Sequence, residues 1–205
     1  MSSFWRYRIR FSKRGTVRFI SHRDLMDVFA RAFRRAALPV RMSQGFNPRP
    51  RFSLPAPLSL GIEGLDEVLE LDLSSELPAE EVAERLAREL PEGIRVLQSE
   101  QPESTKRGRI VSTLYHVRGP LPSDAVERCT DAEELPATRR EGTTVNIRPY
   151  LKSISPSEDG CDVEVLVTQK GSARPAEIVA ALVGDRPALA RDISLVRTAV
   201  NLAPL

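Results

Sequence analysis

The sequence contains little cysteine and no long hydrophobic run, and each shortage excludes a class of protein. Only two of its 205 residues are cysteines, Cys129 and Cys161, and they form no CxxC or CxxxCxxC pattern. This excludes a zinc or iron–sulfur site whose ligands are cysteines of this chain alone. No stretch approaches the roughly 18 consecutive apolar residues of a membrane-spanning helix, and MSSFWRYRIR has no signal-peptide core. We therefore predict a soluble chain in a reducing cytoplasm, without membrane contact and without a metal or cofactor of its own.

Motifs of common catalytic sites are also missing. The sequence contains no GxxxxGK[ST], GxGxxG, HExxH or GxSxG pattern and no pair of acidic residues at a metal-binding spacing. Its two histidines are His22 and His116. His116 lies in an alternating strand pattern, where exposure is the default. This favours a chain that is not itself an enzyme, with His22 as the one candidate acid/base.

Acidic residues are scarce at the beginning of the chain. Residues 1–60 contain thirteen lysines and arginines and two acidic residues, Asp24 and Asp27, a net charge of +11, whereas the rest of the chain carries −9. Such asymmetry predicts a surface that faces a polyanion. The alternative is a basic face that only forms salt bridges with the acidic remainder. Composition does not choose between them, so the placement of the arginines must.

Two segments about half a chain apart share one pattern. A strand-like EVLELDL, residues 67–73, precedes a helical pattern opened by Pro78, and EVLVTQK, residues 164–170, precedes one opened by Pro175. Each proline follows the first residue of its strand by 11 positions, and PAEEVAERL aligns with PAEIVAALV at an offset of 97. Proline is common in the first turn of a helix. The equal spacing predicts an internal duplication.

Hydrophobic periodicity extends this duplication over the whole chain. In each half it predicts the order β-α-β-β-α-β, which is typical of the ferredoxin-like unit. The polar segment SEQPESTKRGR, residues 99–109, is the natural linker. The predicted fold is therefore α+β, with two tandem ferredoxin-like halves: a basic N-terminal half at 1–98, the linker at 99–109, and an acidic C-terminal half at 110–205.

The first predicted strand, residues 5–11, carries a row of arginines. Arg6, Arg8 and Arg10 alternate with apolar residues, so they share one face at spacings of about 6.6–6.8 Å. Three like charges in one row repel one another unless an anion or acidic neighbours face them. Because helices cover one face of a ferredoxin-like sheet, we expect this row on the open face or in a groove between the halves. An edge strand kept soluble by charge is the alternative.

The predicted helix 21–37 is sorted in the same way. Ser21, followed three residues later by Asp24, is similar to a capping box, so we expect both to start the helix. Asp27 can form an i,i+4 ion pair with Arg23 or Arg31. Apolar residues occupy one side of the helix, and the opposite side carries Arg23, Asp27, Arg31, Arg34 and Arg35.

The segment GFNPRPRFS, residues 45–53, presents two further arginines between prolines. Prolines remove backbone donors and stiffen the chain, so we expect a presented loop. Phe46 and Phe52 bracket these arginines, and an aromatic ring beside arginine can stack on an unpaired base. A Phe46 that is buried as a loop anchor is an equal alternative. In the second half, NIRPYLKSI (residues 146–154) is the one place where the acidic half could join the same surface, through Arg148.

These residues also carry a family resemblance. The stretches FISHRDLM, SQGFNP and PLSLG, followed by an acidic strand, resemble the N-terminal signature of the radical SAM-linked protein family, and NIRPYL and SARPAEIV resemble its second half. Family members occur beside or fused to radical SAM proteins. Because this chain lacks the cluster-binding cysteines, the resemblance implies the linked partner and not the enzyme. Arg23 stands where the family commonly has leucine, and Arg49 stands where histidine is common, which excludes a catalytic histidine there.

A more distant likeness is to the paired ferredoxin-like RNA-processing proteins of CRISPR systems. They also open with a strand and a helix that follows a hydrophobic-Ser/Gly-His-x-Asp-Leu stretch. Some are metal-free endonucleases that use a histidine, which would correspond here to His22. The likeness favours RNA binding and does not establish cleavage.

Three hypotheses follow. The first is an RNA-binding accessory protein that presents RNA, such as tRNA or ribosomal RNA, to a partner radical SAM enzyme. The second is a scaffold that docks on a radical SAM protein, and the third is a metal-independent endoribonuclease that uses His22. For the first, the candidate phosphate-binding residues are Arg6, Arg8, Arg10, Arg18, Arg23, Arg31, Arg34, Arg35, Arg49, Arg51 and Arg148.

Overall fold

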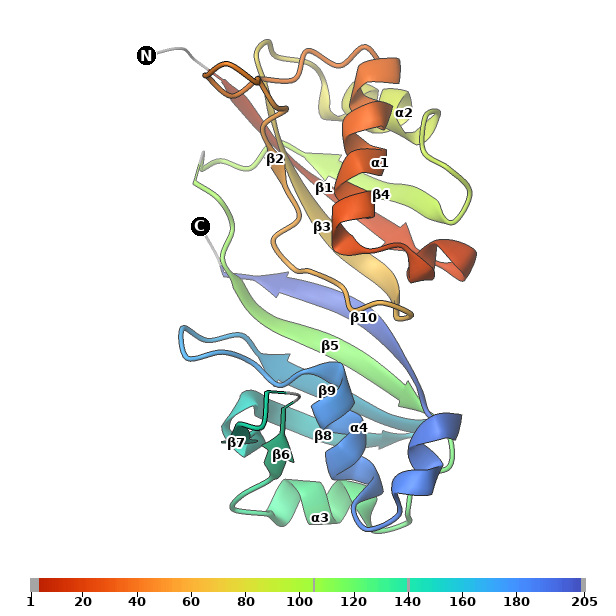
Figure 1. The fold of residues 1–205 in the computed structure, drawn as a ribbon. Coiled ribbons are helices and arrows are strands. Elements are labelled where there is room, and N and C mark those ends of the chain that lie inside the picture. Colours follow the sequence, from red (N-terminus) through yellow and green to blue (C-terminus); the bar gives the residue numbers. More distant parts are fainter. Residues whose placement is uncertain (1–3, 105, 140, 204–205) are drawn as a thin grey trace. The chain divides into compact units, whose positions relative to one another are not determined.

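The computed structural model describes residues 4–104, 106–139 and 141–203. The chain forms two compact units, one of Met1–Arg109 with Ala203–Leu205 and one of Ile110–Leu202, and each combines strands with helices (Figure 1). The α+β class is therefore confirmed. The strand that closes the first unit extends through Ser99 and Glu100, which the sequence analysis had assigned to the linker. None of the described helices is long and apolar enough to cross a membrane.

The first unit contains four antiparallel strands and two α-helices. Its strands lie in the order β4-β1-β3-β2, so the first strand lies between the last and the third. In chain order the elements are β1 (Trp5–Lys13), the 3-10 helix η1 (Gly15–Phe19), α1 (His22–Arg35), β2 (Phe52–Ser53), β3 (Glu63–Leu73), α2 (Ala79–Ala87) and β4 (Ile94–Glu100).

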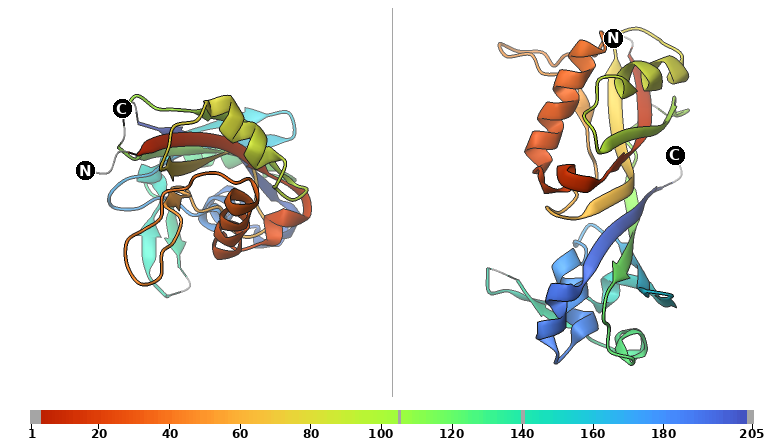
Figure 2. Two further views of the ribbon diagram at one scale, coloured as in Figure 1. Left: turned by 90° about the horizontal axis from the view of Figure 1, so that it is seen from above. Right: turned by 90° about the vertical axis from the view of Figure 1, so that its right-hand side faces the viewer.

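The core of this unit lies between one face of the sheet and both helices (Figures 1 and 2). Alternation along β1 buries Tyr7, Ile9 and Phe11 on that face. The apolar side of α1 packs against them, and the rings of Phe11 and Phe29 meet edge to face at 5.0 Å. Burying one side of α1 leaves the opposite side of the helix to solvent.

The opposite face of the sheet pairs the arginines of β1 with acids. Arg6 donates two hydrogen bonds to Asp72, at 2.8 and 3.0 Å. Arg8 lies 3.5 Å from Glu70 and 3.2 Å from Glu100. In the same way, Arg10 lies 3.2 Å from Asp66. Acidic neighbours thus face this row, where the sequence analysis expected an open face or a groove.

The segment before the second unit covers part of this charged face. The backbone N–H of Gly108 donates to the Glu70 carboxylate at 2.7 Å, and both residues are buried. Residues assigned to a linker by their polarity therefore pack back on the first unit. The Gly108 N–H thereby gives the buried Glu70 carboxylate a hydrogen bond in addition to its ion pair with Arg8.

The second unit contains four longer antiparallel strands, in the order β10-β5-β9-β8, and a small β6-β7 ribbon. Its first strand, β5, again lies between the last and the third of the four. In chain order the elements are β5 (Ile110–Arg118), α3 (Ala125–Asp131), β6 (Pro136–Thr138), β7 (Thr144–Asn146), η2 (Arg148–Tyr150), β8 (Leu151–Ser157), β9 (Gly160–Leu166), α4 (Pro175–Val183), η3 (Pro187–Asp192) and β10 (Ser194–Leu202).

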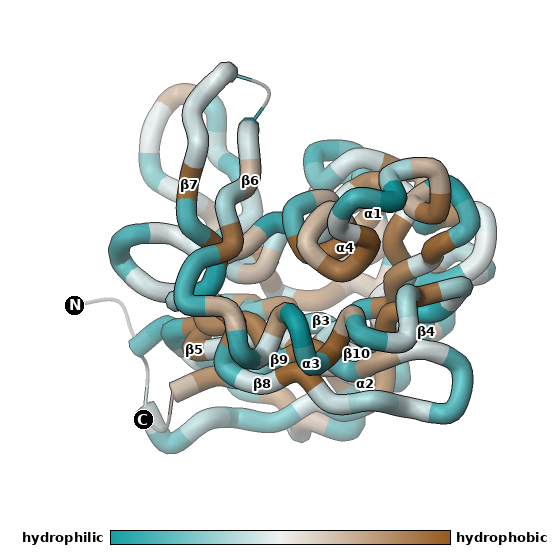
Figure 3. The backbone as a smooth tube through the Cα atoms, turned by 90° about the horizontal axis from the view of Figure 1, so that it is seen from below, coloured by the Kyte–Doolittle hydropathy of each residue, from teal (hydrophilic) through white to brown (hydrophobic). Residues whose placement is uncertain are grey.

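Apolar side chains of α3 and α4 pack on this second sheet. Pro175 begins α4, as its sequence pattern predicts, and the helix is mostly apolar along its length (Figure 3). Cys129 and Cys161 lie in this core as free thiols. Burial raises the pKa of both, that of Cys161 to about 11, so the thiols stay protonated and act as small apolar side chains.

His116 lies on the other face of β5, between two aspartates. Its Nδ1 lies 2.6 Å from the Asp162 carboxylate and its Nε2 lies 2.8 Å from that of Asp159. Arg118 also binds Asp159, at 2.9 Å. The hydrogen bond to Asp162, more than any other contact, raises the pKa of His116, and burial opposes this only in part. The alternating strand pattern predicts an exposed histidine by default; the side chain is instead half-buried.

The ion-paired face of the first sheet predicts that one substitution which removes a buried negative charge lowers the stability strongly. The side chains of Arg6 and Asp72 are only 7% and 3% exposed. Asp72→Asn removes the charge that neutralises the buried Arg6 guanidinium, so the free energy of unfolding should fall by about 3–5 kcal/mol. Urea unfolding measures this. The matched control is Glu84→Gln, whose partner Arg88 is exposed, and which should cost less than about 1 kcal/mol. Equal losses would contradict the assignment.

The His116 cluster predicts a pH dependence. A raised folded-state pKa means that the charged imidazole stabilises the fold. This contribution is fully present below the unfolded pKa of about 6.5 and is lost as the pH rises through the folded pKa. The stability difference between the wild type and His116→Gln should therefore be largest in mild acid and shrink above neutrality. Unfolding of both proteins across pH, with an NMR titration of the imidazole, measures it; a His116 pKa at or below 6.5 contradicts the prediction.

Candidate nucleic-acid interface

Helix α1 begins with the capping box that the sequence predicted. The Ser21 hydroxyl accepts the backbone N–H of Asp24 at 3.1 Å, and the Asp24 carboxylate accepts the backbone N–H of Ser21 at 3.2 Å. The hydrogen bond from the Ser21 side chain is the main cause that lowers the pKa of Asp24. With its start fixed and its apolar side buried, the helix holds its arginines outward.

About half of the thirteen basic residues in the first sixty have acidic partners. Besides the three arginines of β1, Arg14 and Arg18 lie 3.7 and 3.5 Å from Glu63, and Arg35 lies 3.0 Å from Glu89. Lys13 is buried and donates to the backbone carbonyl of Ile20 at 3.0 Å.

Six arginines remain, and all lie on α1 or on the segment that follows it. Among residues 4–104, 106–139 and 141–203, the structure describes no ion pair for any of them. No acidic residue occurs between Val28 and Ile62, where five of the six lie. Arg23 lies next to Asp24, whose carboxylate binds Ser21 instead. We call these six the basic surface: Arg23, Arg31, Arg34, Arg41, Arg49 and Arg51.

On the helix itself, the basic surface consists of Arg23, Arg31 and Arg34, all exposed. The ion pair that Asp27 could form with Arg23 or Arg31 is absent from the described part of the chain. Arg35, which the sequence analysis grouped with the three, turns toward Glu89 and donates to both its carboxylate and its backbone carbonyl.

The segment after α1 folds back on itself as a narrow loop. The N–H of Ser43 donates to the carbonyl of Arg49 at 2.7 Å, and the N–H of Arg51 donates to that of Arg41 at 2.8 Å. We call residues 42–50 the Phe46 loop. Phe46 lies near its tip and is fully exposed.

The two phenylalanines that bracket the loop arginines have different surroundings. Phe52 packs on Phe33 of α1, with ring centroids 5.0 Å apart, and so anchors the end of the segment. Phe46 is not the anchor that the sequence left open as an alternative. Arg41, which the sequence analysis did not select, stacks its guanidinium 4.6 Å from the ring of Phe4. The stretch without acidic residues that surrounds Arg41 could have pointed to it.

Arg148 lies in the second unit, and its guanidinium forms hydrogen bonds with backbone atoms of that unit. It donates to the carbonyl oxygens of Thr130, Ala132 and Leu151, at 2.9, 3.1 and 2.8 Å. These bonds hold η2 against the end of α3 and the start of β8. They occupy the donors that a phosphate would need.

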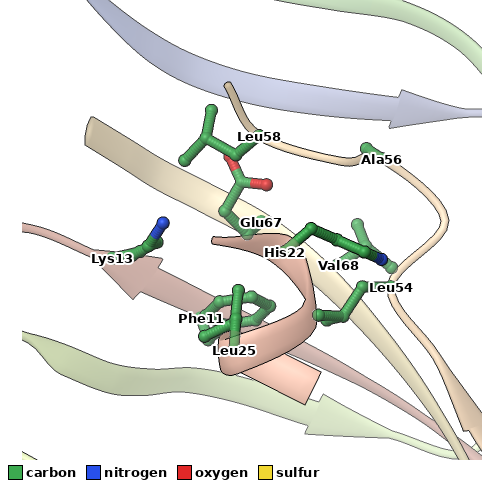
Figure 4. Close-up of a pocket in the computed structure, with 9 residues that line it drawn as sticks. All are labelled: Phe11, Lys13, His22, Leu25, Leu54, Ala56, Leu58, Glu67 and Val68. Atoms are coloured by element: carbon green, nitrogen blue, oxygen red, sulfur yellow. The ribbon is translucent and has the colours of Figure 1, made fainter. Parts of the chain in front are cut away.

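His22 is the first residue of α1 and lines a small cavity with Lys13 and Glu67 (Figure 4). In Figure 4 its side chain extends toward Val68 and Leu54 and away from Lys13. The cavity has a volume of about 10 Å³, the room of about one water molecule. A nucleotide does not fit there, and the role of His22 as acid/base stays a prediction. No group of three or more potential metal ligands is close together among the described residues.

A protein-family model matches residues 6–175, which include parts of both units. The chain belongs to the family described as "Uncharacterized protein conserved in bacteria (DUF2344)". This description of the DUF2344 family names no activity. Among solved structures, one similar chain is described as "Crystal Structure of an Unknown Protein from Galdieria sulphuraria". The two sequences are 14% identical, and the alignment covers 96% of this chain and 99% of that chain, with a TM-score of 0.31. A search of curated proteins finds no match.

In this DUF2344 protein, the cap of α1 predicts a stability effect on the element that carries the basic surface. Ser21→Ala removes the acceptor for the Asp24 N–H, so the free energy of unfolding should fall by about 1 kcal/mol. Urea unfolding measures the loss. Ser59→Ala, at another exposed serine of the same unit, should stay within about 0.5 kcal/mol of wild type. A Ser21→Ala protein as stable as that control would show that the box does not hold the helix start.

Proposed function

We propose that the protein binds RNA through its basic surface and presents it to a partner radical SAM enzyme. The observation that carries RNA binding is the set of six arginines on α1 and the segment after it for which the described part of the chain forms no ion pair. The resemblance of FISHRDLM, SQGFNP and NIRPYL to the radical SAM-linked family supports the partner. The two cysteines of this chain are buried, so the partner would supply the iron–sulfur cluster and its radical chemistry.

The chemistry of the basic surface suits an anion with paired oxygens, such as a phosphate. A guanidinium presents a planar fork of donors that matches two oxygens of a phosphate or carboxylate group. Elsewhere in the first unit, several arginines bind carboxylates, as Arg6 binds Asp72 and Arg35 binds Glu89. For the arginines of the basic surface, the described residues form no such ion pair, which leaves their side-chain donors available to a ligand. Phosphate contacts of this kind give affinity and little choice of sequence.

We also propose that the two units are tandem ferredoxin-like halves. In each, the first strand lies between the last and the third, and the second strand follows the third. The equal 11-residue spacing from strand to helix proline supports a duplication. The distant likeness to the paired RNA-processing proteins of CRISPR systems would then be a likeness of fold.

RNA affinity should depend steeply on salt. If the six arginines contact phosphates, the affinity for labelled bulk tRNA should fall by about 10²–10³ between about 50 and about 200 mM salt, because each contact releases counterions. Replacing Arg23, Arg31 and Arg34 together by glutamine should lower the slope of log affinity against log salt by about 2, at about 0.7 for each phosphate contact. Fluorescence anisotropy measures both quantities.

The control removes the same charge elsewhere. Arg88, which directly follows α2, Arg95 of β4 and Arg191 of η3 are exposed, and their joint replacement by glutamine should leave the slope near that of wild type. An equal decrease for both triple variants would mean that net charge alone binds RNA. No binding by the wild type at low salt would reject the proposed function.

A protein-docking scaffold is the second candidate, favoured by the exposed Phe46 and Met42. Co-purification of the tagged protein from its native cells, with and without ribonuclease, separates the two. A radical SAM protein retained after ribonuclease treatment, without bound RNA, favours the scaffold. A discrete RNA that is lost with the Arg23, Arg31 and Arg34 substitutions favours RNA presentation.

A further inference from the structure

Phe46 is an apolar ring that the fold places in water. Phe11, Phe29 and Phe33 are buried in the core of the same unit, and Phe52 packs against it. Phe46 is fully exposed, and within the described residues no ring or guanidinium contact to it is present. Removing a phenylalanine ring from water lowers the free energy, so a ligand that covers Phe46 would gain affinity from that burial.

The loop that carries Phe46 is held in shape before any ligand arrives. Backbone bonds join Ser43 to Arg49 and Arg51 to Arg41, and the Ser43 hydroxyl also accepts the N–H of Arg49 at 2.9 Å. Pro48 fixes one backbone dihedral beside the tip, and Gly45 takes a φ of +125° that favours glycine. A preformed loop loses little conformational entropy on binding, so more of the contact energy remains as affinity.

The charges beside the ring define its ligand. Arg41, Arg49 and Arg51 lie in and beside the loop, and no acidic residue occurs between Val28 and Ile62. A flat apolar ring among cations matches a nucleotide whose base is unpaired, since the base offers a flat face and its phosphates offer negative charge. In a continuous duplex the base faces are covered by their neighbours, which leaves the ring nothing to stack on.

We propose that Phe46 stacks on an unpaired base of the RNA while the loop arginines Arg49 and Arg51 bind the adjoining phosphates. The protein thereby selects RNA that has a bulge, a loop or a single-stranded segment over continuous duplex. This inference rests on the proposed function and adds the structural class of its substrate.

The test uses two RNA probes, a continuous duplex and the same duplex with one unpaired 2-aminopurine nucleotide. Wild-type protein should bind the bulged probe more tightly and quench its fluorescence. Phe46→Leu keeps an apolar side chain and removes the flat ring, so affinity for the bulged probe should fall by about 5- to 150-fold, the range expected for one base–aromatic stack. Phe46→Tyr should retain the preference and the quenching.

Two controls separate stacking from other effects. All Phe46 variants should bind the continuous duplex like wild type, and they should melt like wild type because the side chain is exposed. Phe19→Leu changes another exposed phenylalanine, which already lies 4.8 Å from the Arg18 guanidinium, and should not alter the preference.

The outcomes separate this inference from the proposed function. If wild type binds both probes and Phe46→Leu keeps the preference for the bulge, the base-stacking role is wrong while RNA binding stands. If Phe46→Leu changes only the capture of a radical SAM protein and no RNA affinity, the ring contacts protein, and the inference is also overturned. If wild type binds neither probe, the proposed function itself fails.

Discussion

The carboxylates of β3 bind the guanidinium groups of β1, and this pairing determines which arginines of the basic half remain for a ligand. A row of like charges along one strand is repulsive, and a buried guanidinium is tolerated only beside a compensating charge. Asp72, Glu70 and Asp66 provide these charges across the strand pair. With β1 neutralised, the positive field of the first sixty residues comes from α1 and the segment after it. The net charge of +11 therefore does not correspond to one uniform face.

Local patterns predicted the elements well because each depends on residues that are close in sequence. The capping box of Ser21 and Asp24 and the start of α4 at Pro175 occur as expected. The ion pairs of β1 were not predictable in the same way. Arg6 and Asp72 are 66 positions apart, and whether two such side chains meet depends on strand register, where a shift of one residue moves every side chain to the other face. The polar segment 99–109 was assigned to a linker for a similar reason, because its bond to Glu70 exists only in the folded unit.

The two phenylalanines of the loop region also show that a local sequence pattern does not predict which residues meet in the fold. In the sequence, Phe46 and Phe52 flank Arg49 and Arg51 equally. In the fold, Phe52 belongs to β2 and meets Phe33, whereas Phe46 lies in a turn where no described element packs against it. Periodicity assigns faces only within regular helices and strands, so it does not decide the burial of a turn residue.

The two units share one strand order and differ in where their arginines lie. In the second unit several polar side chains bind within the unit. Arg148 holds backbone carbonyls, Arg139 binds the buried Glu177 at 2.8 Å, and His116 lies between two aspartates. Exposed positions tolerate substitution at little cost in stability, whereas the buried framework does not. Two units can therefore share one strand order while arginines that form no ion pair among the described residues gather on exposed positions of one of them.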